Sequence, residues 1–293
     1  MDFEDLRAFT AVAERGSFSR AAEALFRTQP AVSKRVAALE EALGARLFDR
    51  IGHRITLTEA GRALLPRARR ILAELDDSAR AVTNLSGRVA GVLTVGTSHH
   101  VGLHRLPPVL RAYARAYPEV ELDLKFLSSE AASTGVEHGE LELALVTLPL
   151  KPAPALATRT VWRDVLYPVV ADDHPLARAR APSAADLAAH PAVLPSRGTF
   201  TRETVERAFT AQGVKLNVRL STNYLETLKM LVAVGLGWSV LPHTILADGV
   251  RALSLPRLDL SRDLGVVRHR DRTLSNAAAA LIETLQAHAD PAC

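Results

Sequence analysis

Apolar residues in the first 58 positions recur with the spacing of short helices. They follow one another every three or four residues over 3–14, 19–25 and 29–43, which places them on one face of each helix. Along the third segment this face runs from Val32 to Leu43. Small residues in the second segment allow it to cross the third closely. The pattern therefore predicts two helices joined by a tight turn and packed on a first helix, which is a helix-turn-helix unit.

The polar face at the start of the third predicted helix has the residue types that read DNA. Thr28 can cap this helix, Pro30 suits its first turn, and Gly44 ends it. Small and polar side chains at the start of a helix can enter the major groove and reach base edges. We therefore predict DNA contacts from Thr28, Gln29, Pro30, Ser33 and Lys34.

A short hairpin, or wing, is predicted directly after this helix. Two strand-like runs, 47–50 and 54–57, flank the turn Ile51-Gly52-His53. Basic side chains near such a tip suit phosphate contacts, which position a DNA reader without specifying the base sequence. The predicted phosphate contacts are Arg50, His53 and Arg54. The alternative interpretation is that the two arginines are solvated surface charges.

Residues 59–88 carry a seven-residue repeat. Its members are Leu64, Ile71, Ser78 and Leu85. A second apolar series lies between them, so the segment predicts a long helix with a heptad seam. We expect two copies to pair along this seam, because a helix-turn-helix usually reads paired half-sites. The alternative is a single amphipathic connector that packs only on its own domain.

The remaining residues alternate between strand-like and helix-like patterns. Strands are predicted at Val92–Thr97, Glu121–Leu127, Leu141–Thr147, Leu166–Ala171, Lys215–Leu220, Trp238–Leu241 and Leu264–Arg268. Helices are predicted near Leu106–Tyr117, Glu130–His138, Arg202–Gln212, Leu225–Val234 and Leu274–His288. This alternation predicts an α/β sheet with parallel strands. Ligands of such sheets bind at the carboxyl ends of the strands, often between two subdomains.

Composition and charge narrow the class of protein. The chain has 293 residues, 48% of them hydrophobic, and a net charge of +4. Residues 27–70 hold ten Lys or Arg and four acids, so this segment carries +6 and the rest of the chain −2. A basic segment on a nearly neutral body is typical of local nucleic-acid contact. No apolar run reaches 18 residues, the N-terminus does not resemble a signal peptide, and the single cysteine is Cys293. We therefore expect a cytoplasmic protein with no membrane contact and no intramolecular disulfide.

Other classes of function have weaker support. The chain lacks the G-x-S-x-G, H-E-x-x-H, P-loop and C-x-x-C motifs, and Gly235-Leu236-Gly237 lacks the third glycine of a dinucleotide fingerprint. His100 and His104 could face a metal from one helix, but no third ligand lies near them in sequence. An enzyme or a metal sensor with an accessory DNA-binding domain is therefore the alternative function. We expect no catalytic residues, no metal and no cofactor.

Four blocks of sequence resemble the LysR-type transcriptional regulators over essentially the full chain. They are AAEALFRTQPAVSKRVAALEEALGARLFDR, LTEAGRALL, LPPVLRAYARAYPEVEL and LVAVGLGWSVLP. The resemblance implies a winged helix-turn-helix domain (1–58), a linker and dimerisation helix (59–88), and a two-lobed α/β effector domain (89–293) similar to periplasmic binding proteins. Lobe I would comprise 89–164 and 267–293, and lobe II 165–266.

The same resemblance implies how the protein acts. Members form homo-oligomers, typically dimers of dimers, that bend double-stranded promoter DNA and respond to a small-molecule co-inducer. Contact with RNA polymerase is allowed, and activation and repression both remain open.

The predicted effector site begins where the first strand of the effector domain ends. Thr97-Ser98-His99-His100 should open a helix, whose free N–H groups and dipole can hold an anion. By resemblance, and by position at other strand ends and helix starts, the predicted effector contacts are Thr97, Ser98, His99, His100, Ser128, Ser129, Thr147, Ser196, Arg197, Thr199, Phe200 and Asn223. Arg197 is the predicted counter-charge for a small anion, although ordinary helix capping and a surface-loop arginine would also explain these residues. An aromatic or hydrophobic acid is equally allowed, and His99 or His100 could sense pH.

Overall fold

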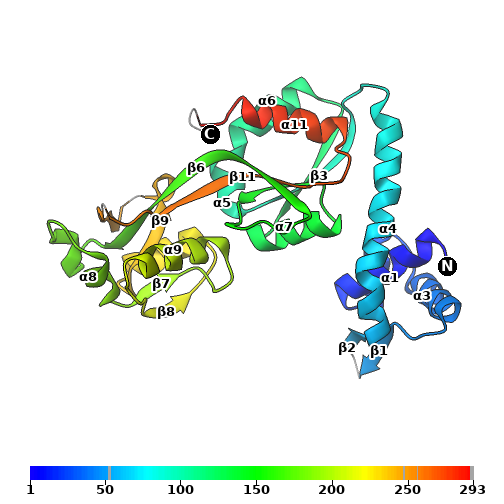
Figure 1. Cartoon of the computed structure of the whole chain (residues 1–293), viewed down its shortest axis with the longest axis horizontal. Helices are drawn as coiled ribbons and strands as arrows, with labels where there is room; N and C mark the ends of the chain where they lie inside the picture. The colour runs from blue at the N-terminus through cyan, green and yellow to red at the C-terminus, as the bar shows by residue number, and fades with distance from the viewer. Residues whose placement is uncertain (52–53, 247, 256, 291–293) are drawn as a thin grey trace. The chain divides into compact units, whose positions relative to one another are not determined.

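The computed structural model describes residues 1–51, 54–246, 248–255 and 257–290. The chain divides into two compact units, Met1–Gly87 and Arg88–Cys293 (Figure 1). In the described parts of the chain, no helix is both long and apolar enough to cross a membrane.

The first unit contains a helical core followed by a hairpin and a long helix. Its elements are α1 (Phe3–Arg15), α2 (Phe18–Ala24), α3 (Gln29–Leu43), β1 (Phe48–Ile51), β2 (Arg54–Leu57) and α4 (Glu59–Asn84). The strands pair antiparallel. The predicted helix-turn-helix and wing are therefore both confirmed. α1, α2 and α3 begin and end within one residue of their predicted limits, whereas α4 ends four residues before its predicted limit of 88.

The core of this unit forms where α1, α2 and α3 cross. Phe9, Val36 and Leu39 are buried there together with Phe48 from the wing. Leu43 was predicted to extend the apolar face of α3, but its side chain is 42% exposed. The buried stripe therefore ends one turn before the helix does.

The long helix α4 plays two roles along its length. Its first half, including Ala68 and Leu72, packs on the core of the first unit. Farther along, Val82 and Leu85 are 70% and 86% exposed. The helix continues through Pro66. The connector interpretation thus describes part of the first half, whereas Ile71 of the predicted seam is 38% exposed and the second half is more exposed still.

The second unit has two lobes joined by two long strands. Its elements are β3 (Gly91–Thr97), α5 (His99–His104), α6 (Leu106–Ala116), β4 (Val120–Phe126), α7 (Ser129–His138), β5 (Leu143–Thr147), β6 (Leu156–Ala171), η1 (Pro175–Arg178), α8 (Ala184–Ala188), β7 (Ala192–Leu194), α9 (Phe200–Ala211), β8 (Val218–Ser221), α10 (Leu225–Ala233), β9 (Ser239–Pro242), η2 (His243–Ile245), β10 (Val250–Ala252), β11 (Ser261–His269) and α11 (Asn276–Gln286). Strands β6 and β11 run side by side between the lobes in Figure 1.

The described strands of the second unit form a mixed seven-stranded sheet and a separate two-stranded sheet of β7 and β8, so the prediction of parallel strands is only partly correct. β3 pairs parallel with β4 and β5, and β7 pairs parallel with β8. However, β11 is antiparallel to β5 and β6, and β6 is antiparallel to β9 and β10. The chain returns along β11 beside β6 instead of crossing over through a helix, and strands that return in this way pair antiparallel.

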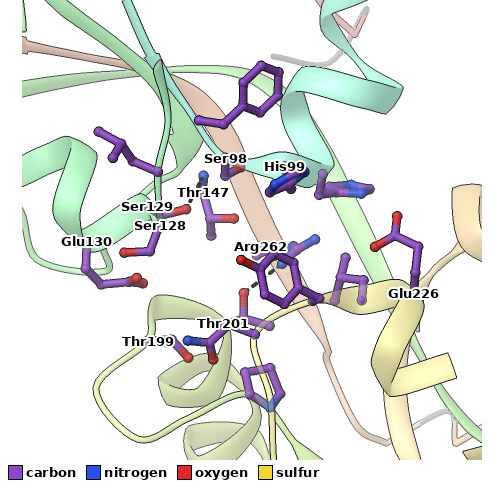
Figure 2. A pocket seen from close by; sticks show the side chains of 17 residues that line it. Ser98, His99, Ser128, Ser129, Glu130, Thr147, Thr199, Thr201, Glu226 and Arg262 are labelled. Atoms are coloured by element: carbon purple, nitrogen blue, oxygen red, sulfur yellow. Dashed lines mark hydrogen bonds between the residues drawn. The ribbon is translucent and has the colours of Figure 1, made fainter. Parts of the chain in front are cut away.

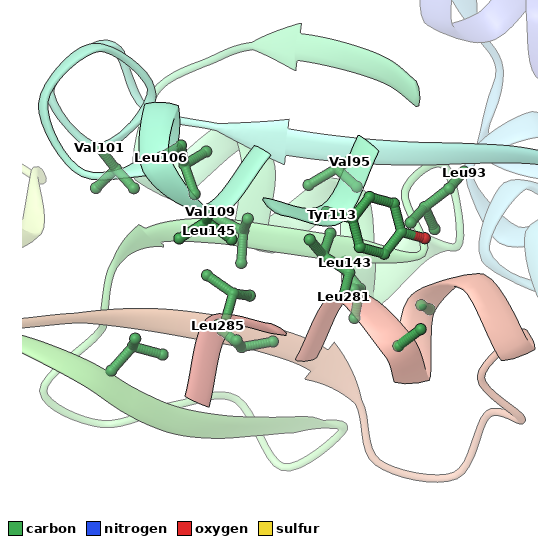
Figure 3. Close-up of a cluster of buried hydrophobic side chains, with 14 of the residues drawn as sticks. Leu93, Val95, Val101, Leu106, Val109, Tyr113, Leu143, Leu145, Leu281 and Leu285 are labelled. Carbon is green, nitrogen blue, oxygen red and sulfur yellow. The ribbon is translucent and has the colours of Figure 1, made fainter. Parts of the chain in front are cut away.

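Each lobe has its own hydrophobic core. In the first lobe, α6 and α11 pack on one face of the sheet, and the Tyr113 hydroxyl donates to the Ala277 carbonyl at 2.8 Å between them (Figure 3). In the second lobe, Phe209 and Trp238 stack with ring centroids 5.3 Å apart. The predicted lobe limits, 164/165 and 266/267, fall inside β6 and β11, the strands that the lobes share.

Candidate DNA-reading surface and effector cleft

The start of α3 presents the residues that were predicted to read DNA. Thr28, Gln29, Pro30 and Lys34 are exposed and Ser33 is half-buried. Thr28 stands at the N-cap position, but its side chain makes no capping hydrogen bond. Its hydroxyl therefore has no role in closing the helix.

The wing carries two of its three predicted phosphate contacts on paired strands. Arg50 of β1 lies opposite Ile55, and Arg54 of β2 lies opposite Ile51. His53 lies outside the described residues.

A cleft of about 270 Å³ lies between the two lobes of the second unit (Figure 2). Eight predicted effector contacts line it: Ser98, His99, His100, Ser128, Ser129, Thr147, Thr199 and Asn223. Polar side chains from separate parts of the chain thus converge on one cavity.

Four other predicted contacts do not line this cleft. They are Thr97, Ser196, Arg197 and Phe200. Thr97 is fully buried and its hydroxyl donates to the Leu145 carbonyl at 2.9 Å. Arg197 is exposed. Ser196 instead donates its N–H to Asn223 Oδ1 at 2.9 Å, which orients that lining residue.

A direct hydrogen bond connects the lobes across the cleft. The N–H of Phe200, the first residue of α9, donates to Glu130 Oε1 of α7 at 2.8 Å. A helix start leaves its first N–H groups without intrahelical partners, and a carboxylate there also interacts favourably with the helix dipole. In this conformation Glu130 therefore occupies an anion position at the start of α9.

An ionic cluster is formed by Asp164, Arg262 and His100, which are buried, and by Arg105, which is partly exposed; Arg262 and His100 line the cleft. Arg262 Nε donates to Asp164 Oδ2 at 2.9 Å, and Arg262 Nη2 lies 2.8 Å from the same oxygen. Arg105 Nη2 is 3.6 Å from Asp164 Oδ1. Arg262 also donates through Nη1 to Thr201 Oγ1 of α9 at 2.6 Å. The cluster therefore connects both inter-lobe strands with the second lobe.

The surroundings of Asp164 and His100 in this cluster lower the pKa of both side chains. Burial alone would raise the pKa of Asp164, but His100 and the charge of Arg262 together lower it to about 2. Burial lowers the pKa of His100, and the positive charge of Arg262 acts in the same direction against the opposing effect of Asp164. His100 Nε2 lies 3.4 Å from Asp164 Oδ2, but neither ring nitrogen has a well-formed hydrogen bond among the described residues. His100 is therefore a neutral ring near pH 7.

One wall of the cleft is aromatic. The His99 ring lies 5.3 Å from Phe126 of the first lobe and 5.4 Å from Tyr224 of the second, measured between centroids. Such tilted and edge-on arrangements are favourable for aromatic pairs. The cleft thus combines a hydroxyl-rich side with an apolar ring wall.

The structure places no metal-binding cluster at the paired histidines. The rings of His100 and His104 have centroids 5.2 Å apart, and His104 faces Glu226 at 3.6 Å. Over the described residues, no group of three or more His, Cys, Asp or Glu is arranged to hold a metal ion.

Sequence reasoning missed nine residues that line the cleft. They are Phe126, Leu127, Glu130, Pro195, Thr201, Tyr224, Leu225, Glu226 and Arg262. Glu130 follows Ser129 at a predicted helix start, so its position gave a local signal. Arg262 gave none, because its strand reaches the cleft only through pairing with β6, almost 100 residues earlier in the chain.

The chain is similar to known proteins over nearly its whole length. The family model of the LysR substrate binding domain matches residues 86–290, and that of the bacterial regulatory helix-turn-helix protein, lysR family, matches residues 3–62. A probable RuBisCO transcriptional regulator of Cyanidioschyzon merolae is 30% identical over 94% of this chain and 94% of its own length.

Two solved structures share the fold. The crystal structure of full-length CbnR complexed with its target DNA matches 99% of this chain and 100% of that chain, with a TM-score of 0.65 and 23% identity. The effector binding domain of QuiR in complex with shikimate covers 68% of this chain and 97% of its own, with a TM-score of 0.64 and 17% identity.

The family models account for both units, and the fold agrees with them from the winged helix-turn-helix to the two-lobed domain. This confirms the resemblance seen in the sequence and gives no support to the enzyme alternative. The chain belongs to the LysR family, and it is a ligand-responsive DNA-binding transcriptional regulator.

Proposed function

We propose that the inter-lobe cleft binds a small anionic effector, and that its occupancy controls how the protein engages paired operator half-sites. The observation that carries this proposal is the convergence of three helix starts. The N-cap residues of α7, α9 and α10, which are Ser128, Thr199 and Tyr224, all line the cleft. Free N–H groups and aligned helix dipoles at such ends favour a negative charge.

Unsatisfied polar atoms in the cleft support the same proposal. Ser98 Oγ and His100 Nδ1 are buried without a hydrogen-bond partner among the described residues, whereas His100 Nε2 lies 3.4 Å from Asp164. Buried polar groups are usually paired, so such atoms indicate a missing ligand or water. We propose that the effector contacts Ser98, His99, His100, Ser128, Ser129, Thr147, Thr199 and Asn223.

The counter-charge in this proposal comes from the base of the cleft and not from Arg197. Arg262 and Arg105 share the single carboxylate of Asp164. With His100 neutral, this cluster holds one positive charge in excess. Arg262 is the cluster's arginine that lines the cleft, and it is almost completely buried, so its charge is weakly screened and favours an anion there once the Glu130 carboxylate is displaced. QuiR, which has the same fold, is in complex with shikimate, a small carboxylate.

The inter-lobe bond of Glu130 provides a mechanism for control. An effector anion that binds beside the lining residue Thr199, at the start of α9, competes with the Glu130 carboxylate that holds the N–H of Phe200. The two states then differ in lobe contact, and a ligand that prefers one of them shifts the population toward it. Through the long helix α4 this change reaches the DNA-reading unit in our proposal.

The N-terminal unit is proposed to read DNA as a pair or as a dimer of dimers. Gln29, Ser33 and Lys34 would contact base edges and the wing arginines phosphates. Val82 of α4 and Leu85 directly after it are exposed, which supports pairing between copies. CbnR, which has the same fold, is complexed with its target DNA. We further propose cytoplasmic action at promoters, with RNA polymerase as a contact there.

Reciprocal binding tests this function. Sulfate and shikimate serve as first probes, titrated into the full-length protein alone and into its complex with the duplex that it selects from a random library. Coupled sites require different affinities in the two titrations, typically 5- to 150-fold apart. A probe that binds in the cleft with equal affinity in both states would contradict effector control.

A further inference from the structure

The turn between α2 and α3 contains a residue that the fold itself does not explain. Phe26 has a φ of 52° and is the only non-glycine residue with positive φ in the described parts of the chain. Its side chain is 95% exposed, more than that of any other large hydrophobic residue described. A bulky residue in the left-handed region is uncommon and costs conformational energy.

The backbone around Phe26 shows why this position needs a left-handed residue. The N–H of Phe26 donates to the Glu23 carbonyl at 3.1 Å, and the N–H of Arg27 donates to the Ala22 carbonyl at 2.9 Å. These two bonds form the Schellman motif that closes a helix, and its left-handed position is usually glycine, sometimes asparagine.

Two other helices of the same unit provide an internal comparison. α1 ends at Gly16 with a φ of 59°, and α3 ends at Gly44 with a φ of 62°. At the end of α2 the same conformation carries a phenyl ring that contacts nothing in the core. Strain of this kind that brings no gain in packing points to a role outside the fold.

The position of Phe26 identifies the partner. It lies three residues before Gln29, and the exposed side chains of Arg27 and Thr28 connect it to the DNA-reading start of α3. The nearby exposed cations, Arg27 and Lys34, suit a polyanion more than an apolar protein surface. DNA also offers apolar groups to such a ring, namely the 5-methyl of thymine in the major groove and the deoxyribose face.

We propose that Phe26 is a DNA-contacting residue that places its ring against an apolar group of the operator, either a thymine methyl or a deoxyribose. The left-handed turn holds the ring clear of the protein, and the bound DNA covers it. The contact adds to specific affinity without releasing counterions, unlike a contact from Lys or Arg.

The test uses the full-length protein and the duplex that the wild type selects from a random library. Phe26→Gly removes the ring and suits the backbone, Phe26→Asn is a second ring-free variant, and Phe26→Tyr keeps the ring. Leu43→Ala, at the far end of α3, is the matched control for loss of an exposed apolar side chain. Unfolding midpoints of all variants are measured alongside, and Phe26→Gly should remain near wild-type stability because relief of strain opposes the greater entropy of the unfolded chain.

We expect both ring-free variants to bind the selected duplex about 5- to 30-fold more weakly, as loss of a buried apolar contact implies. The salt dependence of binding should be unchanged, and Phe26→Tyr and Leu43→Ala should bind like the wild type. Replacing operator thymines by deoxyuridine, which lacks the 5-methyl group, distinguishes a contact with a thymine methyl from a contact with a deoxyribose. If the wild type loses affinity at one substituted position and Phe26→Gly does not, the contact is a thymine methyl; if only the ring matters, it is a deoxyribose.

Ring-free variants that bind within about 2-fold of the wild type overturn the proposal. If these variants bind DNA normally but fail to support transcription by purified RNA polymerase, the ring contacts a protein instead, and the DNA assignment is wrong.

Discussion

Asp164 of β6 and Arg262 of β11 lie directly opposite each other on the two strands that join the lobes, and their charges meet at 2.8 Å. Both side chains are almost completely buried. Because Arg262 also donates to Thr201 in the second lobe, this pair connects the inter-lobe strands to the lining of the inter-lobe cleft.

Replacing only one partner of the Asp164–Arg262 pair should lower the stability of the protein. Asp164→Asn leaves the Arg262 guanidinium buried without its counter-charge, which we expect to lower the free energy of unfolding by about 3–5 kcal/mol. Urea denaturation measures this loss. The double variant Asp164→Asn/Arg262→Met removes both charges and should recover much of the stability. A single variant as stable as the wild type would show that the pair does not constrain the inter-lobe strands.

His100 should make stability depend on pH. Its pKa is lowered in the folded protein, chiefly by burial, so between that lowered value and the ordinary value near 6.5 the unfolded chain binds a proton that the folded chain does not. The contribution is therefore present above about pH 6.5 and is lost as the pH falls below it. Denaturation at about pH 7 and pH 5 should show a smaller loss in His100→Gln than in the wild type. Equal losses would contradict a neutral buried ring.

The same side chain tests the pH-sensing hypothesis. If His100 participates in sensing pH, its alanine variant should lose any change in effector response between about pH 7 and pH 5, because its lowered pKa places its titration below about 6.5. A pH-dependent response that is unaltered by the substitution would exclude this role.

Glu130 should compete with anions for the start of α9. Glu130→Gln removes a negative charge from the cleft and weakens the bond to the Phe200 N–H. We expect sulfate to bind about 2- to 5-fold more tightly to this variant, as loss of a partly exposed charge interaction implies. Glu137→Gln, on the same helix but outside the cleft lining, is the matched control. Weaker sulfate binding in Glu130→Gln would mean that Glu130 assists the ligand instead of competing with it.

The two predicted classes of DNA contact should respond differently to substitution. Arg50→Ala should weaken binding to all sequences alike and reduce the salt slope by about 0.9, because one phosphate contact releases about that many counterions. Gln29→Ala should change which sequences are preferred. Binding and selection from a random duplex library at several salt concentrations measure both effects. An unchanged order of preference in Gln29→Ala would show that Gln29 does not read bases.

Features that depend on residues close together in the sequence were predicted correctly, and features that depend on residues far apart were not. The recognition helix was located within one residue, because Val32, Val36 and Leu39 repeat locally and Gly44 ends the helix. The cleft residues Ser98 and Ser128 were predicted because each directly follows a predicted strand, and ligands of such sheets bind at the carboxyl ends of the strands.

Long-range pairing was the main cause of error. The strand β6 was predicted to begin at Leu166 but starts at Leu156, because Arg163 and Asp164 interrupt its apolar pattern. The charge of Asp164 is compensated by Arg262, which only the antiparallel return of β11 brings near. Arg197, the locally attractive cation, is exposed and outside the cleft lining.

Recovery of bound genomic DNA tests the central claim most directly. The full-length protein is incubated with sheared DNA from its host, with and without the deproteinised small-molecule extract of the same cells, and the recovered fragments are sequenced. The account predicts a few sharp sites with paired half-sites, whose occupancy or extent changes when the extract is present. Broad, sequence-blind recovery under both conditions would contradict a ligand-responsive regulator.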